Sequence, residues 1–146
     1  MKISRVTAIL AHPITIAAAS VITTLAARDR RGVGTRLGVA LPLGVLTSKA
    51  LKRAFPRRKK RLFTLTPRES FPSGHAAATT AYALSLFDAV RGRKVGAAAV
   101  ALIAFVDACR YHDDEHRPSE LAVGNLIGLV AAVAGGLIAR RTAPAD

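Results

Sequence analysis

The stretch VTAILAHPITIAAASVITTLAA, residues 6–27, decides the fold class of this chain, because none of its side chains is charged. At about 1.5 Å of rise per residue, a helix of this length crosses a hydrocarbon core of about 30 Å. A cleaved signal peptide is the alternative, since Lys2 and Arg5 precede the run. The run is long for such a peptide, however, and the basic segment 28–31 follows it directly. We therefore predict a transmembrane helix.

Further apolar runs follow along the chain, at residues 33–51, 73–90, 95–109 and 119–139. The run 95–109 is the weakest, because Asp107 interrupts it and such a short segment alone could be a buried helix of a soluble protein. Glycine and alanine crowd these runs, and small residues allow close helix contact within a membrane. We predict an all-α fold, a polytopic membrane bundle of about five transmembrane helices that forms a single domain over residues 1–146.

The composition combines high hydrophobicity with high positive charge. Hydrophobic residues make up 51% of the chain, yet 22 Lys and Arg stand against 9 Asp and Glu, for a net charge of +13. These facts agree if the apolar residues form membrane-length runs and the cations lie between them, beside phosphate headgroups. No nucleic-acid partner is expected, because the basic run in the candidate linker 52–68 is flanked by predicted spans and lacks interleaved aromatic residues. We expect a multi-pass protein of the cell membrane, in contact with membrane lipids.

The order of the spans places the candidate functional residues on one membrane face. Five successive spans put the loop between the second and third spans on the same face as the loop between the fourth and fifth. That face collects Lys49, Lys52, Arg57, Arg58, Lys59, Lys60, Ser73, His75, Arg110, His116 and Glu120. Cations are numerous on both faces, so the charge count does not decide which face is cytoplasmic. We expect a functional site at one membrane face.

The segment Phe71-Pro72-Ser73-Gly74-His75 is the first candidate site. Pro72 suits the first position of a helix, which would leave the amides of Ser73, Gly74 and His75 pointing outward from the positive helix end. Such an end binds anions, Gly74 permits close approach to the backbone, and the Ser73 hydroxyl can donate a hydrogen bond. The alternative is an ordinary helix start, with Ser73 as the cap and His75 as a structural residue.

The second candidate site comprises Arg110, His116 and Glu120. Pro118 can open the last helix, which leaves His116 just before it and Glu120 in its first turn. The Glu120 carboxylate can then hold one imidazole nitrogen, so that the other acts as a base or nucleophile. The alternative is a polar loop followed by an acid that favours a helix N-terminus. Asp107, one turn before Arg110, is expected to pair with it.

Together these motifs resemble the type 2 phosphatidic acid phosphatase family, also called the lipid-phosphatase and vanadium-haloperoxidase superfamily. The family signature reads Lys-x6-Arg-Pro, Pro-Ser-Gly-His and Ser-Arg-x5-His-x3-Asp. Its second part is intact at residues 72–75. Its third part keeps the spacing, with Cys109 in place of serine and Glu120 in place of aspartate. In the first part, Lys52 and Lys59 have the expected spacing, but Lys59-Lys60 replaces Arg-Pro.

The resemblance implies a mechanism that uses neither metal nor cofactor. His116 would attack phosphorus to give a phosphohistidine, Glu120 would orient it, and His75 would protonate the departing oxygen. The groups that would hold the phosphate oxygens are Lys52, Lys59, Ser73, the Gly74 amide and Arg110, with Arg57 or Arg58 as substitutes for the missing guanidinium. The implied substrate is a lipid phosphate, either a phosphomonoester or a diphosphate, on a polyprenyl-linked or phosphatidyl group.

Two other functions remain open at this point. One is a non-catalytic membrane protein that binds anionic phospholipid or a protein partner through the basic residues 52–61. The other is a metal-dependent membrane hydrolase that uses the acids and histidines of residues 112–116, a set of ligands suited to a divalent cation. An oligomer is compatible with either, because the short fourth span could bury its polar face against a partner.

Overall fold

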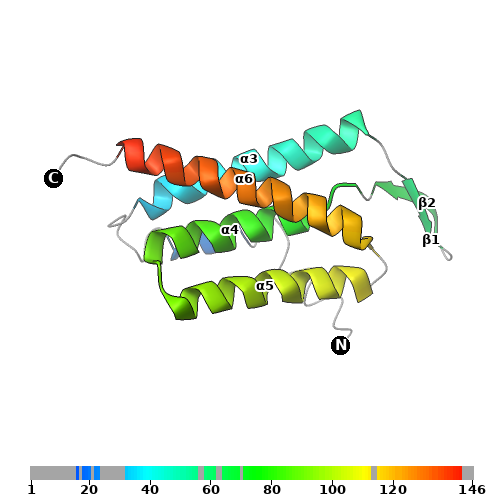
Figure 1. Ribbon diagram of the computed structural model, residues 1–146. Helices are drawn as coiled ribbons and strands as arrows, with labels where there is room; N and C mark the ends of the chain where they lie inside the picture. The colour runs from blue at the N-terminus through cyan, green and yellow to red at the C-terminus, as the bar shows by residue number, and fades with distance from the viewer. Residues whose placement is uncertain are drawn as a thin grey trace.

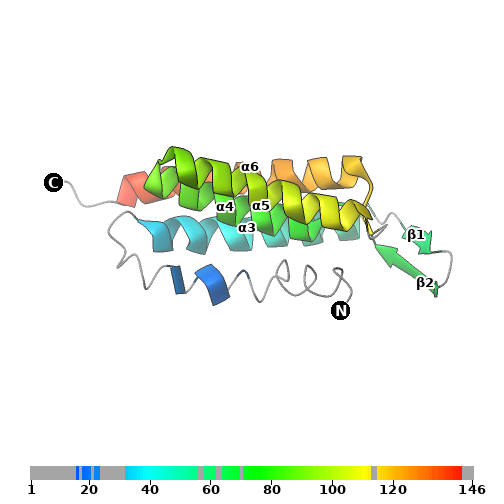
Figure 2. The same ribbon diagram turned by 90° about the horizontal axis from the view of Figure 1, so that it is seen from below.

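The structure is a computed structural model that describes residues 16, 18–20, 22–23, 32–55, 58–61, 64–69, 71–112 and 115–142. Helices α3 (Val33–Ala54), α4 (Gly74–Val90), α5 (Arg93–His112) and α6 (Pro118–Thr142) run side by side along a shared long axis (Figures 1 and 2). Helices α3, α4 and α6 pack on one another, and α5 packs on α4. The protein is therefore a helix bundle, and the predicted all-α fold class is confirmed.

The four later apolar runs all form helices, with ends within a few residues of those predicted. Of the first run, 6–27, residues 16, 18–20 and 22–23 are helical, and the Thr23 hydroxyl lies 3.0 Å from the Tyr82 hydroxyl of α4. The rest of that run lies outside the described residues. Two of the described helices, α5 and α6, are long and apolar enough to cross a membrane by length and composition.

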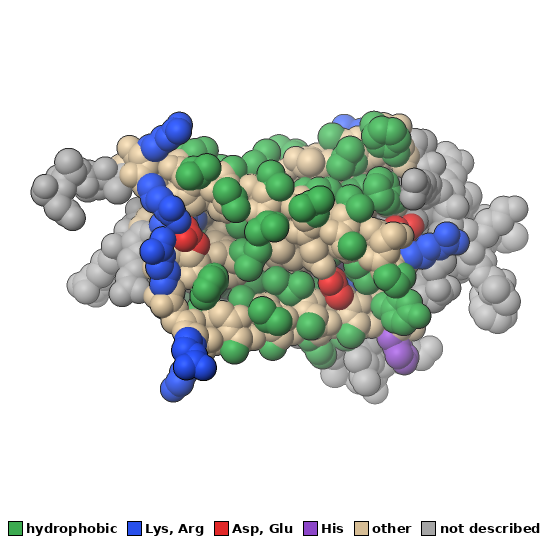
Figure 3. All heavy atoms as spheres, viewed as in Figure 1, with side chains coloured by type: hydrophobic (Ala, Val, Ile, Leu, Met, Phe, Trp, Pro, Cys, Tyr) green, Lys and Arg blue, Asp and Glu red, His purple; other side chains and the backbone are tan. Residues whose placement is uncertain are grey.

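The bundle exposes large apolar side chains along α5 and α6. Figure 3 shows hydrophobic side chains over the middle of the molecule and a column of Lys and Arg side chains at one end. The exposed apolar side chains of these two helices include Val100, Leu102, Phe105, Leu126, Leu129, Val130 and Val133. A water-exposed surface of this kind is unusual for a soluble monomer. It is the surface expected of helices that face lipid.

Helix α6 approaches α4 so closely that only glycine fits at the contact. A Cβ atom added to Gly124 would lie 2.5 Å from the Ser73 carbonyl oxygen, and one added to Gly128 would lie 2.5 Å from the Ala77 carbonyl oxygen. Small residues also fill the interior, where Ala40, Ala81 and Ala131 form one buried cluster. Close backbone contact therefore replaces large interlocking side chains, as is common between helices in membranes.

Residues 58–61 and 64–69 form the two strands of a short hairpin in the stretch 52–68 that was predicted as a linker. Strand β1 (Arg58–Arg61) pairs antiparallel with β2 (Thr64–Glu69), with Arg58 opposite Glu69. Lys52, at the start of the predicted linker, belongs to the last turn of α3. A two-stranded ribbon has two edge strands, so it tolerates Pro67, and threonine favours strands. The hairpin extends from the bundle end where α3 stops and α4 starts (Figure 1).

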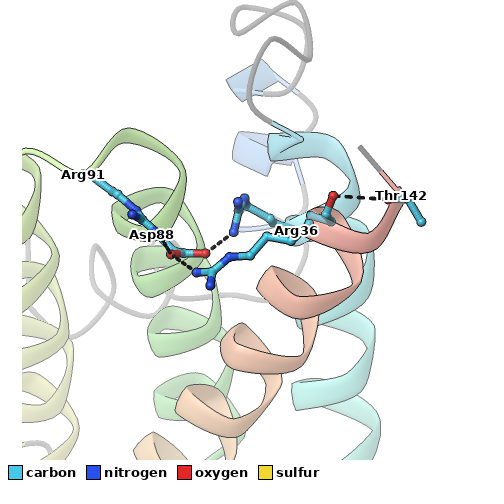
Figure 4. Close-up of polar contacts among 6 residues, drawn as sticks. Arg36, Asp88, Arg91 and Thr142 are labelled. Carbon is cyan, nitrogen blue, oxygen red and sulfur yellow. Dashed lines mark hydrogen bonds and ion pairs between the residues drawn. The ribbon is translucent and has the colours of Figure 1, made fainter. Parts of the chain in front are cut away.

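A cluster of ionic contacts ties the helices together at the opposite end. Asp88, near the end of α4, accepts hydrogen bonds from Arg36 of α3 and from Arg140 of α6, the latter at 2.9 Å (Figure 4). The Arg91 guanidinium lies 3.6 Å from the same carboxylate. The Arg36 side chain is only 10% exposed, and its ion pair with Asp88 compensates a charge that would be costly to bury alone. The three central helices are therefore held at this end by one carboxylate.

Candidate active site

The two sequence motifs meet at the hairpin end of the bundle, where α4 and α6 begin and α3 and α5 end (Figure 1). The Ser73 amide donates a hydrogen bond of 3.1 Å to the Glu120 carbonyl. The missing side chain of Gly124, one turn further along α6, allows this contact. Segments that lie almost fifty residues apart in the sequence are thus joined backbone to backbone, at the end predicted from the order of the helices.

The start of α4 differs in one respect from the prediction. Ser73, not Pro72, precedes the first helical residue, and its hydroxyl accepts a hydrogen bond of 3.3 Å from the Ala76 amide. The prediction that the Ser73 amide points outward is therefore wrong, because that amide donates a hydrogen bond to the Glu120 carbonyl. The amides of Gly74 and His75 remain as the first donors of the helix, which lack acceptors within it. They form the positive end of the α4 dipole.

The Glu120 side chain links the helix start to His116. One carboxylate oxygen of Glu120, Oε2, accepts a hydrogen bond of 2.9 Å from the Arg117 amide, in the manner of a capping box. The same oxygen lies 3.5 Å from Nδ1 of His116. Both side chains are buried, at 8% and 6% exposure. The carboxylate therefore lies beside Nδ1, which leaves Nε2 as the nitrogen for chemistry.

The environment of His116 favours its neutral form. Burial lowers the pKa of His116, the positive charges of Lys52 and Arg110 lower it further, and Glu120 opposes both effects. The net result is a pKa below the usual value of 6.5. A neutral imidazole has a free lone pair, which a nucleophile or base requires.

Arg110 is the buried cation of the site. It is 4% exposed, and its guanidinium forms an ion pair with the Glu115 carboxylate. The Arg110 carbonyl accepts hydrogen bonds from the amides of Glu115, at 3.1 Å, and of His116, at 3.3 Å. The end of α5 therefore positions both the cation and the loop that carries His116.

The predicted pair between Asp107 and Arg110 is wrong. The Asp107 carboxylate accepts a hydrogen bond of 2.5 Å from Asn125 of α6, and the Asn125 side chain accepts one of 2.7 Å from Thr80 of α4. Arg110 turns instead to Glu115. Residues three apart on a helix can pair, but Asn125 offers Asp107 a neutral donor between the helices and Glu115 offers Arg110 a full charge.

The model of the PAP2 superfamily matches residues 11–141, a range that includes both motifs, helices α3 to α5 and all but the last residue of α6. The chain belongs to the PAP2 superfamily. PAP2 members are phosphatases, so the match indicates phosphatase or phosphoesterase activity on a phosphate-bearing substrate. It also confirms the resemblance noted in the sequence. Searches of the curated proteins and of the solved structures return no match.

The structure locates some, but not all, of the residues in the first motif of the PAP2 signature. Lys52 lies in the last turn of α3 and interacts electrostatically with both His75 and His116, which places its charge at the site. Arg58 and Lys59 lie in strand β1, which extends from the same end of the bundle. Their side chains, and Arg57 as a whole, lie outside the described part of the protein. Their contribution to phosphate binding stays a prediction.

The sequence did not predict the role of Glu115 as a partner of Arg110 in the site. The sequence indicated only a candidate metal ligand at Glu115, whereas the structure pairs it with Arg110. An acid directly before His116 was the available signal. Among the described residues no group of three or more His, Cys, Asp and Glu is arranged to hold a metal ion. Asp113 and Asp114, from the middle of the candidate metal cluster, lie outside that part of the chain.

A cleft of about 330 Å³ opens between α5 and α6 beside the site. Its lining is mostly apolar and includes Ala108, Tyr111, Pro118, Leu121 and Ala122. Asp107 and Asn125 supply its polar side. Because Pro118 begins the helix that carries Glu120, the cleft lies next to the residues of the second motif. An apolar channel of this kind can accept a hydrocarbon chain.

Proposed function

We propose that this PAP2 protein is a multi-pass enzyme of the cell membrane that hydrolyses a lipid phosphate through a phosphohistidine on His116. In this proposal residues 1–146 form one integral-membrane domain. The observation that carries it is the contact between Ser73 and Glu120, which joins the Pro-Ser-Gly-His segment to the helix that orients His116. An anion-binding helix start and a buried neutral imidazole at one place are the parts that phosphoryl transfer requires.

The proposed reaction has two steps. In the first, Nε2 of His116 attacks phosphorus, the bond to the leaving oxygen breaks, and His75 gives that oxygen a proton. In the second, water attacks the phosphohistidine, returns a proton to His75, and inorganic phosphate leaves as the bond from phosphorus to Nε2 breaks. Glu120 keeps Nδ1 in place and stabilises the positive charge that develops on the ring. No step in this scheme uses a metal ion or a cofactor.

Positive charge near the reacting phosphate is the second requirement, because phosphoryl transfer depends mainly on positioning and electrostatic stabilisation. Arg110 offers a planar guanidinium that can hold two phosphate oxygens, and Lys52 adds a point charge. The Gly74 amide and the Ser73 hydroxyl supply hydrogen-bond donors at the start of α4. Lys59 and either Arg57 or Arg58 would complete the site from the hairpin.

The surroundings of the site support the proposal of a lipid substrate. The site lies at one end of a bundle that exposes apolar side chains along α5 and α6, so a phosphate bound there would be at headgroup depth. The cleft between α5 and α6 would take the chain, which we propose to be polyprenyl-linked or phosphatidyl. If α5 forms further contacts through its exposed face, they could also support an oligomer.

Location in the membrane can be tested by washing membranes that contain the full chain with alkaline carbonate. A multi-pass protein stays in the membrane pellet, because its apolar helices are surrounded by hydrocarbon. A peripheral protein held by its positive charge is released, since surface electrostatic attraction is screened or removed. Release of the full chain into the wash would contradict the proposal.

The activity can be tested by phosphate release from prenyl and phosphatidyl phosphates in detergent, with excess chelator present. His116→Ala should abolish release, whereas His112→Ala is the matched control, because His112 is exposed at the end of α5 and has no role in the proposed reaction. Loss of activity with chelator, or with His112→Ala, would favour the metal-dependent hydrolase. If none of the lipid phosphates reacts, the result would favour a protein that binds anionic lipid without cleaving it.

A further inference from the structure

The ion pair between Glu115 and Arg110 places a negative charge beside the cation that the proposed function assigns to phosphate. The Arg110 side chain is 5% exposed and that of Glu115 is 22% exposed, so water screens the pair only weakly. A carboxylate and a phosphate make similar bidentate contacts with a guanidinium. Any phosphate that binds Arg110 must therefore share the guanidinium with Glu115 or displace its carboxylate.

Displacement cannot take Glu115 far from the site. Its amide donates a hydrogen bond of 3.1 Å to the Arg110 carbonyl, and the next amide, of His116, donates to the same oxygen at 3.3 Å. Glu115 is thus fixed at the backbone between the phosphate-binding arginine and the proposed nucleophile. Its carboxylate therefore extends from a backbone position between the two groups proposed to contact the phosphate.

The carboxylate also interacts electrostatically with His75, the proposed proton donor. His75 must lie beside the leaving oxygen in order to protonate it. In a phosphomonoester that oxygen is bonded to carbon, and the leaving group carries no further charge. In a diphosphate the same oxygen is bonded to a second phosphoryl group, which brings another negative charge to the neighbourhood of His75 and Glu115.

We propose that Glu115 is a specificity-determining residue, which makes this enzyme select lipid phosphomonoesters over lipid diphosphates. The proposal rests on the proposed function and names the substrate class of the same site. Repulsion between Glu115 and the second phosphoryl group raises the barrier for diphosphates, while the single phosphate of a monoester is held by Arg110 and Lys52. Discrimination by a repulsive charge is a common device for specificity.

The test compares farnesyl phosphate with farnesyl diphosphate, which share one prenyl chain. We expect the wild-type protein to show a kcat/KM at least about tenfold higher for the monoester, since like charges in a partly buried site repel strongly. Glu115→Gln keeps the shape and removes the charge, and it should lower this ratio by about tenfold. Glu115→Asp keeps the charge and is the matched control, which should preserve the preference. Thermal unfolding of each variant checks that the fold is retained.

The outcomes separate this inference from the proposed function. If the wild-type protein releases no more phosphate than His116→Ala from either compound, the inference fails together with the prenyl-linked substrate of the proposed function, and release from a phosphatidyl phosphate then tests the remainder of the proposed function. If phosphate is released but the wild-type protein prefers the diphosphate, or Glu115→Gln leaves the ratio unchanged, the inference alone is overturned. Inhibition offers a second readout, the ratio of the inhibition constant of inorganic phosphate to that of pyrophosphate. This ratio should be higher for Glu115→Gln than for the wild-type protein.

Discussion

Nδ1 of His116 lies 3.5 Å from a carboxylate oxygen of Glu120 that also accepts a hydrogen bond from the Arg117 amide. The double use of this oxygen gives a physical reason for glutamate where the family signature has aspartate. Glu120 stands at the third position of α6, from which a glutamate reaches back to the amide at the helix cap. The helix start therefore fixes the carboxylate, which lies beside Nδ1 of the imidazole.

Glu120 should be sensitive to both charge and length. Glu120→Gln removes the charge beside Nδ1, and we expect kcat to fall by about a hundredfold, the size of effect seen when a group that orients a histidine is lost. Glu120→Asp keeps the charge but shortens the arm, so about a tenfold loss is expected. Steady-state phosphate release measures both. Wild-type kcat in Glu120→Gln would show that this carboxylate does not assist His116.

The pKa of His116 predicts the acid limb of the pH profile. The proposed nucleophile must be neutral, and its pKa lies below 6.5, so kcat/KM should fall with acidity only below that pH. Lys52 lowers this pKa, and Lys52→Gln should therefore raise it and move the limb to higher pH. Lys49→Gln, an exposed residue one turn earlier, is the control. An acid limb that stays in place in Lys52→Gln would contradict this assignment.

Gly124 should not tolerate a side chain. In Gly124→Ala the new Cβ would lie 2.5 Å from the Ser73 carbonyl oxygen, and backbone on both sides must move to relieve the clash. We expect a loss of about 2 kcal/mol in the free energy of unfolding, typical of overpacking, together with lower activity. The matched control is Gly38→Ala in α3, where no atom lies within 4 Å of the added Cβ. That control should be neutral or stabilising by about 0.5 kcal/mol, as measured by thermal unfolding in detergent.

Asp88 should matter for stability and not for chemistry. Asp88→Asn removes the negative charge that pairs with the buried Arg36, which should cost about 2 kcal/mol of unfolding free energy, less than for a fully buried pair because Asp88 is 28% exposed. Arg91→Ala removes a more exposed partner, 68% exposed, and should cost under about 0.5 kcal/mol. Both variants should keep the wild-type KM. Equal stability of Asp88→Asn and the wild-type protein would show that the ionic contacts of Asp88 do not stabilise the bundle.

Much of the fold follows from the sequence, because long apolar runs with few charges favour helices, and the four later runs form helices close to the predicted bounds. The hairpin at 58–69 was not predicted, since a dense run of Lys and Arg resembles a solvated linker more than a strand. The contacts of Asp88 could not be predicted either, because Arg36 and Arg140 belong to helices that are distant in the sequence. Their contact with Asp88 depends on how α3, α4 and α6 cross. Glycine contacts between the helices determine this crossing, and no local sequence pattern predicts it.

The motifs predicted which residues meet at the site but not how each is held. Pro72 was expected to begin α4, whereas the Ser73 hydroxyl caps the helix and its amide is taken by Glu120. The partner of Arg110 depends on a loop that folds back onto the Arg110 carbonyl, and this reversal brings Glu115 to the guanidinium. Spacing along a helix suggested Asp107 instead. Short-range spacing is a weaker guide where the chain leaves a helix.

The central claim is that His116 becomes phosphorylated during turnover. The most direct measurement uses a lipid phosphomonoester with a radiolabelled phosphate, mixed with the full-length protein in detergent, quenched at early times and mapped by peptide mass spectrometry. The account predicts an acid-labile, base-stable phosphoryl group on the peptide that contains His116, present in the wild-type protein and absent in His116→Ala. Turnover without any label on that peptide, or equal labelling of His116→Ala, would contradict it.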